Sequence, residues 1–169
     1  MRRTPALLLA VGLSAACTRP SPGGGAASAP PAPAAAGGAS VSLERRPCFG
    51  TCPVYTVRID GSGAVLFEGR RFVSDSGAFS GTIARAAVDS LAAELAARGY
   101  FGLADRYVAG QPGCGPYATD LPTVVTEVRV GGRAKRVEHD HGCADAPAVL
   151  DSLEGRIDQV AGVAKWVGR

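Results

Sequence analysis

A β-hairpin pattern between residues 54 and 69 constrains the fold of this 169-residue chain more than any other feature. In VYTVRID (54–60) apolar and polar side chains alternate, which is the period of a strand with one buried face. DGSG (60–63) is typical of a tight hairpin turn, and AVLFEG (64–69) then returns the chain as a partner strand. The stretch therefore predicts an antiparallel sheet.

Further strand patterns lie on both sides of this hairpin. Residues 41–44 alternate in the same way, and residues 72–81 have room for one more short edge strand. A second hairpin is predicted where TVVTEVRV (123–130) and RAKRVEH (133–139) are separated by two glycines. Residues 104–121, which precede it, are rich in Gly and Pro and predict a loop.

Two segments have the spacing of amphipathic helices. The first covers residues 83–98, with Ser80 or Thr82 as its cap and Gly99 as its end, and the second covers residues 146–167. The apolar positions at helical spacing are Ala84, Val88, Leu91, Ala92 and Leu95 in the first and Leu150, Leu153, Ile157, Val160 and Ala164 in the second. The order β-β-β-α-β-β-α predicts an α+β fold: an antiparallel sheet of about five strands with two amphipathic helices packed on one face.

The first 16 residues have the organisation of a secretion signal. Arg2 and Arg3 precede an apolar segment (6–13) that is too short to cross a membrane as a helix, and small residues lead to Cys17. LSAAC (13–17) resembles the lipobox of bacterial lipoproteins, in which the cysteine is diacylated and becomes the new N-terminus. We therefore expect residues 1–16 to be a lipoprotein signal peptide and Cys17 to be lipidated. The alternative is an ordinary cleavable signal in which Cys17 has no role.

Residues 17–40 are expected to form the lipidated cysteine and a tether of Pro, Gly, Ala and Ser, which cannot bury enough apolar surface to fold. The α+β domain then covers residues 41–169. Cleavage after residue 16 removes two of the 18 basic residues and lowers the formal net charge from +3 to +1, so no basic surface for nucleic acid is expected. Thr18 is not an aspartate, and resemblance to Gram-negative sorting rules then favours the outer membrane over the inner.

Four cysteines remain in the domain: Cys48, Cys52, Cys114 and Cys143. An even count in an oxidising compartment favours two disulfides, for which three connectivities exist. Pairing Cys48 with Cys52 closes a small ring in which Gly50 supplies conformational freedom. Pairing Cys114 with Cys143 ties the long loop to the end of the last strand. We favour this connectivity and leave the others open.

CFGTC (48–52) also suggests a redox site or a copper site. A thioredoxin-like dithiol precedes a helix whose N-terminus lowers the thiol pKa, whereas here Pro53 and a strand follow. The motif CFGTCP (48–53) resembles the Cys-x-x-x-Cys-Pro motif of thioredoxin-like copper chaperones, and His139 or His141 could add an imidazole ligand. The parallel strand order of that fold is absent from the sequence pattern, so the motif alone is weak support for a copper site.

HDHGC (139–143) raises a zinc hypothesis of its own. His139 and His141 lie on the same side of an extended strand, and Cys143 or Asp140 could add a ligand. No second ligand pair at metal-site spacing lies nearby in the sequence. We therefore expect both histidines to be solvated at a strand end, and we predict no metal and no other cofactor.

Several segments together resemble an uncharacterised domain family of bacterial exported proteins and lipoproteins. They are RRPCFGTCPVYTVRIDGSGAVLFEG (45–69), TDLPT (119–123), RAKRVEH (133–139) and LEGRIDQVAGVAKW (153–166). The resemblance covers most of the predicted domain. It implies an exported domain of unknown function and assigns no activity to any residue.

The expected function is that of a lipid-anchored envelope protein with a binding or structural role. No Gly-x-Ser-x-Gly elbow and no paired carboxylates mark a catalytic set, so we expect no enzyme. Candidate binding residues are Phe49, Asp120 and His139. The expected partners are the membrane, through Cys17, and an unknown envelope protein or small ligand, at the outer membrane facing the periplasm or the cell surface. The alternative is a periplasmic copper-binding or thiol redox protein that uses the CFGTC pair.

Overall fold

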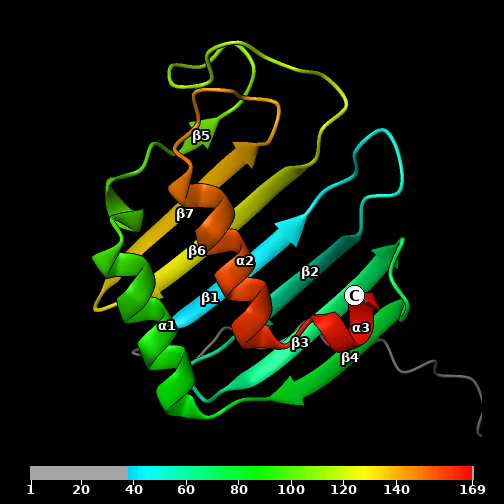
Figure 1. Cartoon of the computed structure of the whole chain (residues 1–169). Coiled ribbons are helices and arrows are strands. Elements are labelled where there is room, and N and C mark those ends of the chain that lie inside the picture. Colours follow the sequence, from blue (N-terminus) through cyan, green and yellow to red (C-terminus); the bar gives the residue numbers. More distant parts are fainter. Residues whose placement is uncertain (1–37, 169) are drawn as a thin grey trace, which may run out of the picture. The chain divides into compact units, whose positions relative to one another are not determined.

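The computed structural model describes residues 38–168, and the predicted signal peptide and Cys17 lie outside the described residues. The predicted α+β class is confirmed, because this part of the chain forms one seven-stranded sheet and two main helices (Figure 1). The strands are β1 (Ser40–Arg45), β2 (Val54–Ile59), β3 (Ala64–Arg71), β4 (Gly77–Thr82), β5 (Arg106–Tyr107), β6 (Thr123–Val130) and β7 (Arg133–Asp140). The helices are α1 (Arg85–Ala97), the 3₁₀ turn η1 (Tyr100–Gly102), α2 (Val149–Ala161) and the short α3 (Ala164–Val167).

The strand order is β4-β3-β2-β1-β6-β7-β5, and the prediction of about five strands is wrong. Both edges of the sheet hold strands with weak sequence signals. β4 pairs with β3 but has no buried residue, and β5 is two residues that run parallel to β7 within the predicted loop 104–121. The short edge strand expected within residues 72–81 is present as β4, whereas β5 was not predicted, because two residues are too few to show an alternating pattern.

Both predicted hairpins are present, and β1 joins them as the central strand. In the turn between β2 and β3, the Asp60 carboxylate accepts a hydrogen bond from the backbone N–H of Ser62 at 2.8 Å. The turn between β6 and β7 is Gly131-Gly132, whose φ angles of 56° and 75° are favourable only for glycine. β1 pairs with β2 on one side and β6 on the other, so one continuous surface receives the helices.

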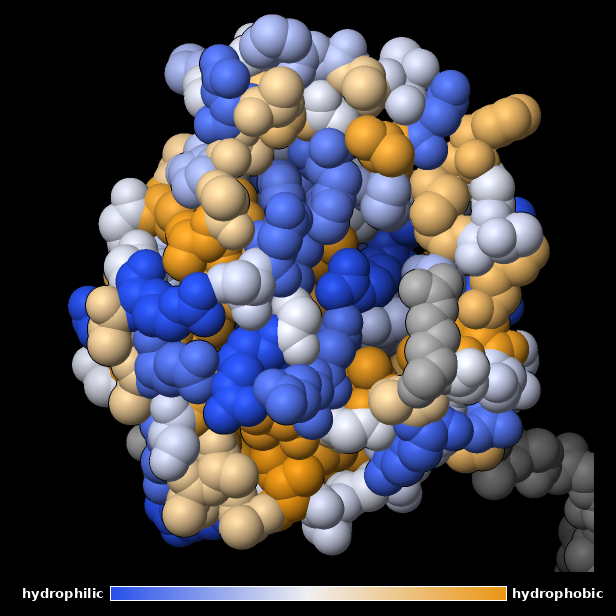
Figure 2. All heavy atoms as spheres, viewed as in Figure 1, coloured by the Kyte–Doolittle hydropathy of each residue, from blue (hydrophilic) through white to orange (hydrophobic). Residues whose placement is uncertain are grey.

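Helices α1 and α2 lie in front of the same face of the sheet in Figure 1, and the core fills the space between. The largest fully buried aliphatic and aromatic side chains include Val41, Leu43, Val57, Ile59, Phe67, Leu91, Leu95, Tyr100, Leu150, Leu153 and Ile157. Figure 2, in the same view, shows hydrophilic residues over much of this side of the molecule. The apolar stripes of the helices therefore face the sheet and their polar sides face solvent.

Helix α1 begins at Arg85, two residues after the predicted start. The prediction of Ser80 or Thr82 as the N-cap is wrong, because both residues belong to β4. The N-cap position is occupied by Ala84, which is exposed and makes no side-chain capping hydrogen bond. The predicted end is confirmed, since Gly99 follows the helix with φ 85°.

The predicted single helix 146–167 is two helices. Gly162 has φ 65°, and the N–H groups of Gly162 and Val163 donate to the carbonyls of Gln159 and Asp158, which closes α2. The turn directs the ring of Trp166 in α3 into the core, stacked on Phe67 with ring centroids 4.9 Å apart. Ala164, predicted to be on the buried stripe, is exposed as a result.

Within residues 38–168, no helix has the length and apolar composition needed to cross a membrane.

Candidate functional site

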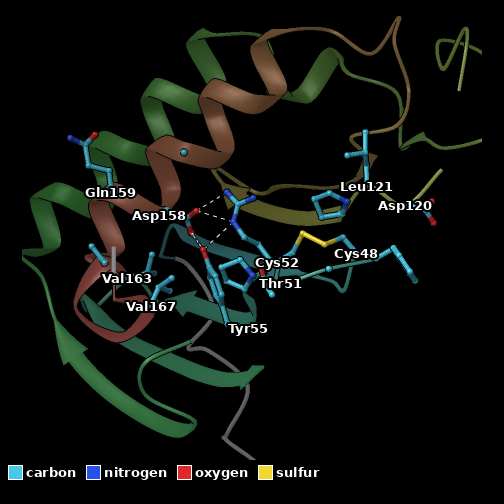
Figure 3. A pocket seen from close by; sticks show the side chains of 17 residues that line it. Cys48, Thr51, Cys52, Tyr55, Asp120, Leu121, Asp158, Gln159, Val163 and Val167 are labelled. Atoms are coloured by element: carbon cyan, nitrogen blue, oxygen red, sulfur yellow. Dashed lines mark hydrogen bonds and ion pairs between the residues drawn. A yellow bond between two sulfur atoms is a disulfide. The ribbon is translucent and has the colours of Figure 1, made fainter. Parts of the chain in front are cut away.

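A pocket of about 860 Å³ opens beside the CFGTC loop, where β1 ends and β2 begins (Figure 3). All five residues of the loop line it, and Asp120 and Leu121 lie on the same rim. The opposite wall comes from α2 and α3, including Val163 and Val167, which Figure 3 shows across from the disulfide. The pocket is therefore formed by segments that are far apart in sequence and meet at one end of the sheet.

The predicted disulfide between Cys48 and Cys52 is present and forms the rim. It closes the loop so tightly that Phe49 at its tip is almost fully exposed, with 87% of its surface open to solvent. The N–H of Phe49 donates to the carbonyl of Asp120 at 3.1 Å, and Asp120 has φ 74°, a left-handed turn conformation. Two of the three predicted binding residues thus meet at this pocket.

Three polar side chains form the floor of the pocket. Arg45 ends β1, Tyr55 lies opposite it in β2, and Asp158 comes from α2. The guanidinium of Arg45 donates to Asp158 Oδ2 from Nη2 at 2.6 Å and from Nε at 3.0 Å, and the Tyr55 hydroxyl donates to Asp158 Oδ1 at 2.8 Å. Arg45 and Asp158 are mostly buried, with side chains 21% and 17% exposed. Their charges neutralise one another within the protein.

Electrostatics hold this floor in one protonation state near neutral pH. Burial raises the pKa of the Tyr55 hydroxyl, and the neighbouring Asp158 carboxylate raises it further. Burial by itself would lower the pKa of Arg45, but the attraction of Asp158 outweighs it and raises that pKa. Tyr55 is therefore neutral and Arg45 charged throughout the physiological range.

The second predicted disulfide, Cys114–Cys143, is also present and lies in the turn region after β7. Both cysteines are buried, and a backbone bridge between Tyr117 and Cys143 adjoins them. The Tyr117 hydroxyl donates to Asp140 Oδ2 at 3.0 Å. The disulfide thus joins the long loop to the end of the last strand, as the sequence suggested.

His139, the third predicted binding residue, does not line the pocket but belongs to a separate cluster under α2. Its Nδ1 lies 2.8 Å from Glu154 Oε1, and Nε2 of His141 lies 3.0 Å from Glu154 Oε2. The prediction that both histidines are solvated is wrong, since His139 is 5% exposed and the side chain of His141 is 26% exposed. His139 is buried and His141 half-buried because α2 places the Glu154 carboxylate over the end of β7, a contact that only the tertiary structure creates.

Hydrogen bonding also sets the charges of this cluster. The bond to Glu154 raises the pKa of His141 above its ordinary value. Burial alone would raise the pKa of Glu154, but the bonds from the two imidazoles outweigh burial and hold that pKa below its usual value. Glu154 is therefore a buried carboxylate that stays ionised.

Sequence reasoning missed Arg45, Asp158 and Glu154. The sequence did contain a signal for Glu154 and Asp158. They are four residues apart, so they lie on the same side of α2, and Glu154 falls within the apolar stripe between Leu153 and Ile157. A charged residue at a core position requires a partner. The partners could not be named, since they come from strands more than ten residues away.

The CFGTC loop presents a disulfide and no free thiol to the pocket. Both sulfurs of Cys48 and Cys52 are consumed by the disulfide, so neither is a thiolate ligand in this state. The described lining contains no histidine or lysine, and the copper hypothesis receives no geometric support because His139 lies outside the pocket.

Comparison with known proteins gives a family and no function. No curated protein matches the chain. Residues 39–161, more than half of the chain, match the family described as "Domain of unknown function (DUF6438)". The match agrees with the expected resemblance to an uncharacterised family. This chain therefore belongs to the DUF6438 family of domains of unknown function.

Proposed function

We propose that this chain is a non-catalytic binding module of the bacterial cell envelope that holds a small, largely apolar molecule in the pocket beside the CFGTC loop. The observation that carries the proposal is the pocket itself, whose volume of about 860 Å³ lies within the range of small-molecule sites. Apolar surface on its walls would supply affinity, and the polar floor would orient the ligand.

The rim and floor support binding because both are held rigid before a ligand arrives. The Cys48–Cys52 disulfide fixes the loop, and the Arg45–Asp158 ion pair joins β1 to α2 across the floor. A preorganised site loses less conformational entropy on binding. Among the described residues, Arg45 Nη1 has no acceptor, so it is the donor available to a ligand oxygen.

The floor also favours a non-catalytic role. Asp158 accepts three hydrogen bonds from Arg45 and Tyr55, which commits its oxygens to structure rather than to proton transfer. A general base must instead have its lone pair directed at the substrate.

Dye binding tests the pocket. The full chain with Cys17→Ser, which prevents lipidation, is titrated with 1-anilinonaphthalene-8-sulfonate, a fluorescent probe of apolar sites. Leu121→Asp on the rim is compared with Leu66→Asp on β3, because these leucines are 46% and 47% exposed and only Leu121 lines the pocket. We expect Leu121→Asp to raise the dissociation constant about tenfold, since a charge at the rim penalises an apolar ligand. Equal dissociation constants for the two variants would overturn the proposed site.

The envelope location rests on the sequence and on the two disulfides. LSAAC (13–17) carries the proposed lipid anchor at Cys17, and structural disulfides persist in oxidising compartments such as the periplasm. In cells, the chain that keeps Cys17 should incorporate labelled palmitate and fractionate with outer membranes. The Cys17→Ser variant should instead be released to the periplasm. Membrane fractionation that Cys17→Ser leaves unchanged would refute the anchor.

A further inference from the structure

Four side chains with metal-binding chemistry converge at the end of β7, away from the pocket. His139 belongs to β7, His141 follows it in the turn, and Asp151 and Glu154 belong to the first turns of α2. One donor atom from each lies within 4.8 Å of every other. None of the four lines the pocket described above.

The spacing between these atoms suits a single small cation. Donor atoms around a tetrahedral zinc ion, with bonds of about 2.0 Å, lie about 3.3 Å apart. Here the Glu154 oxygens lie 2.8 Å from His139 Nδ1 and 3.0 Å from His141 Nε2. Asp151 Oδ1 lies 3.6 Å from His141 Nδ1 and 4.0 Å from His139 Nδ1. These distances involve both ring nitrogens of His141 and both oxygens of Glu154, so they do not belong to one donor set. A set with one donor atom per residue lies within 4.8 Å, and side-chain rotations that shorten its longest separations to about 3.3 Å would seat an ion.

Both backbone segments that carry the ligands are held in place. The imidazole rings of His139 and His141 stack with centroids 4.5 Å apart, so they face α2 together. The turn after them is fixed by the Cys114–Cys143 disulfide, and Asp140 Oδ1 accepts a hydrogen bond from the Gly142 N–H at 2.9 Å. Asp151 and Glu154 are three residues apart, which places them on one side of α2.

The charge of the cluster provides an independent indication. Within residues 38–168, neither Asp151 nor Glu154 forms an ion pair with a lysine or an arginine; their close partners are the two imidazoles. Glu154 is nevertheless almost completely buried. Hydrogen bonds to the two imidazoles compensate the burial of this carboxylate, and a bound metal ion would take their place. With neutral imidazoles the four side chains carry a charge of −2, which a divalent cation would neutralise.

We propose that His139, His141, Asp151 and Glu154 form a binding site for a divalent transition-metal ion, with Zn²⁺ as the best match. Two imidazoles with two carboxylates suit zinc and its neighbours, whereas Ca²⁺ and Mg²⁺ prefer sites made of oxygen alone. Asp151 is 66% exposed and lies on the solvent side, so the ion enters past it. The site ties the end of β7 to α2 and goes beyond the proposed function of the pocket.

Calorimetric titration with Zn²⁺ tests the proposal. The full chain with Cys17→Ser and intact disulfides is used, because this background has no free thiol to bind zinc. We expect one ion per chain. His141→Asn should raise the dissociation constant about 100-fold and Asp151→Asn at least about tenfold, because each removes a ligand from the ion. Asp89→Asn, an exposed aspartate on α1, is the matched control and should bind as the parent does.

A thermal unfolding measurement separates metal binding from a purely structural role. Zn²⁺ should raise the midpoint temperature of unfolding of the parent and of Asp89→Asn, and should leave the midpoint temperature of His141→Asn unchanged. If His141→Asn does not fold, the exposed Asp151→Asn variant still decides, since its side chain has no packing role. Absence of zinc binding by the parent, or parental affinity in Asp151→Asn or a folded His141→Asn, would overturn the proposal. A failure of the dye to bind the pocket would contradict the proposed function but not the metal site, because the pocket and the metal site share no residue.

Discussion

Removal of the Cys114–Cys143 disulfide should destabilise the domain more than removal of Cys48–Cys52. The sequence separations are 29 and 4 residues. A crosslink lowers the entropy of the unfolded chain by an amount that grows with the closed loop, which gives about 3.5 kcal/mol for the larger ring and about 2 kcal/mol for the smaller one. The larger figure is a substantial fraction of the total stability of a domain, about 5–15 kcal/mol.

The structure adds a native-state reason for the same order. Cys114 and Cys143 are buried, and the disulfide crosslinks the long loop to the turn after β7 beside the backbone bridge between Tyr117 and Cys143. The Cys48–Cys52 ring is partly exposed at a loop tip. The difference of about 1.5 kcal/mol from chain entropy is therefore a lower bound.

Urea unfolding of two double variants measures this difference. Cys114→Ala/Cys143→Ala and Cys48→Ala/Cys52→Ala leave no unpaired thiol in the domain and are compared with the Cys17→Ser parent. The single tryptophan, Trp166, is buried against Phe67, so its fluorescence reports unfolding of the core. Equal losses of unfolding free energy, or a greater loss for the small ring, would refute this reasoning.

Four further variants test the pocket floor, the helix break and the core. Asp158→Asn leaves Arg45 without its carboxylate in a mostly buried site, and urea unfolding should show a loss of about 2 kcal/mol. Gly162→Ala should cost about 1 kcal/mol because φ is 65°, whereas Gly155→Ala inside α2 should stabilise by about 0.5 kcal/mol. Burial raises the pKa of Tyr100 to about 12 from 10.0, so its neutral hydroxyl stabilises the fold below pH 10. This contribution is lost as pH rises toward 12, by about 3 kcal/mol relative to Tyr100→Phe in alkaline urea titrations.

Matched controls make each expectation testable. Glu68→Gln removes an exposed pair with Arg70, 57% and 51% exposed, and should cost less than about 0.5 kcal/mol. A cost equal to that of Asp158→Asn would contradict the importance of burial. Effects of the same sign in the two glycine variants would contradict the backbone explanation, and parallel stability curves above pH 10 would contradict the buried state of Tyr100.

Local patterns in the sequence were sufficient for most of the scaffold. Alternation around the DGSG turn predicts the β2–β3 hairpin, and helical spacing of Val88, Leu91 and Leu95 predicts the buried side of α1. These predictions hold because turn geometry and burial of one face depend on residues that are neighbours in the chain. The preferred disulfide pairs also follow from sequence, since one is local and the other joins the only remaining cysteines of the domain.

The edge strand β5 and the candidate sites were decided by tertiary structure. Periodicity gives no signal for β5, and the left-handed turn at Gly162 divides a segment whose apolar spacing continues. Arg45 meets Asp158 across 113 residues of sequence, and His139 meets Glu154 only because α2 crosses the end of β7. Sequence alone thus determined which segments bury a face, because that information is local. Which charges become buried together depends on how those faces pack, and so only the folded chain decides it.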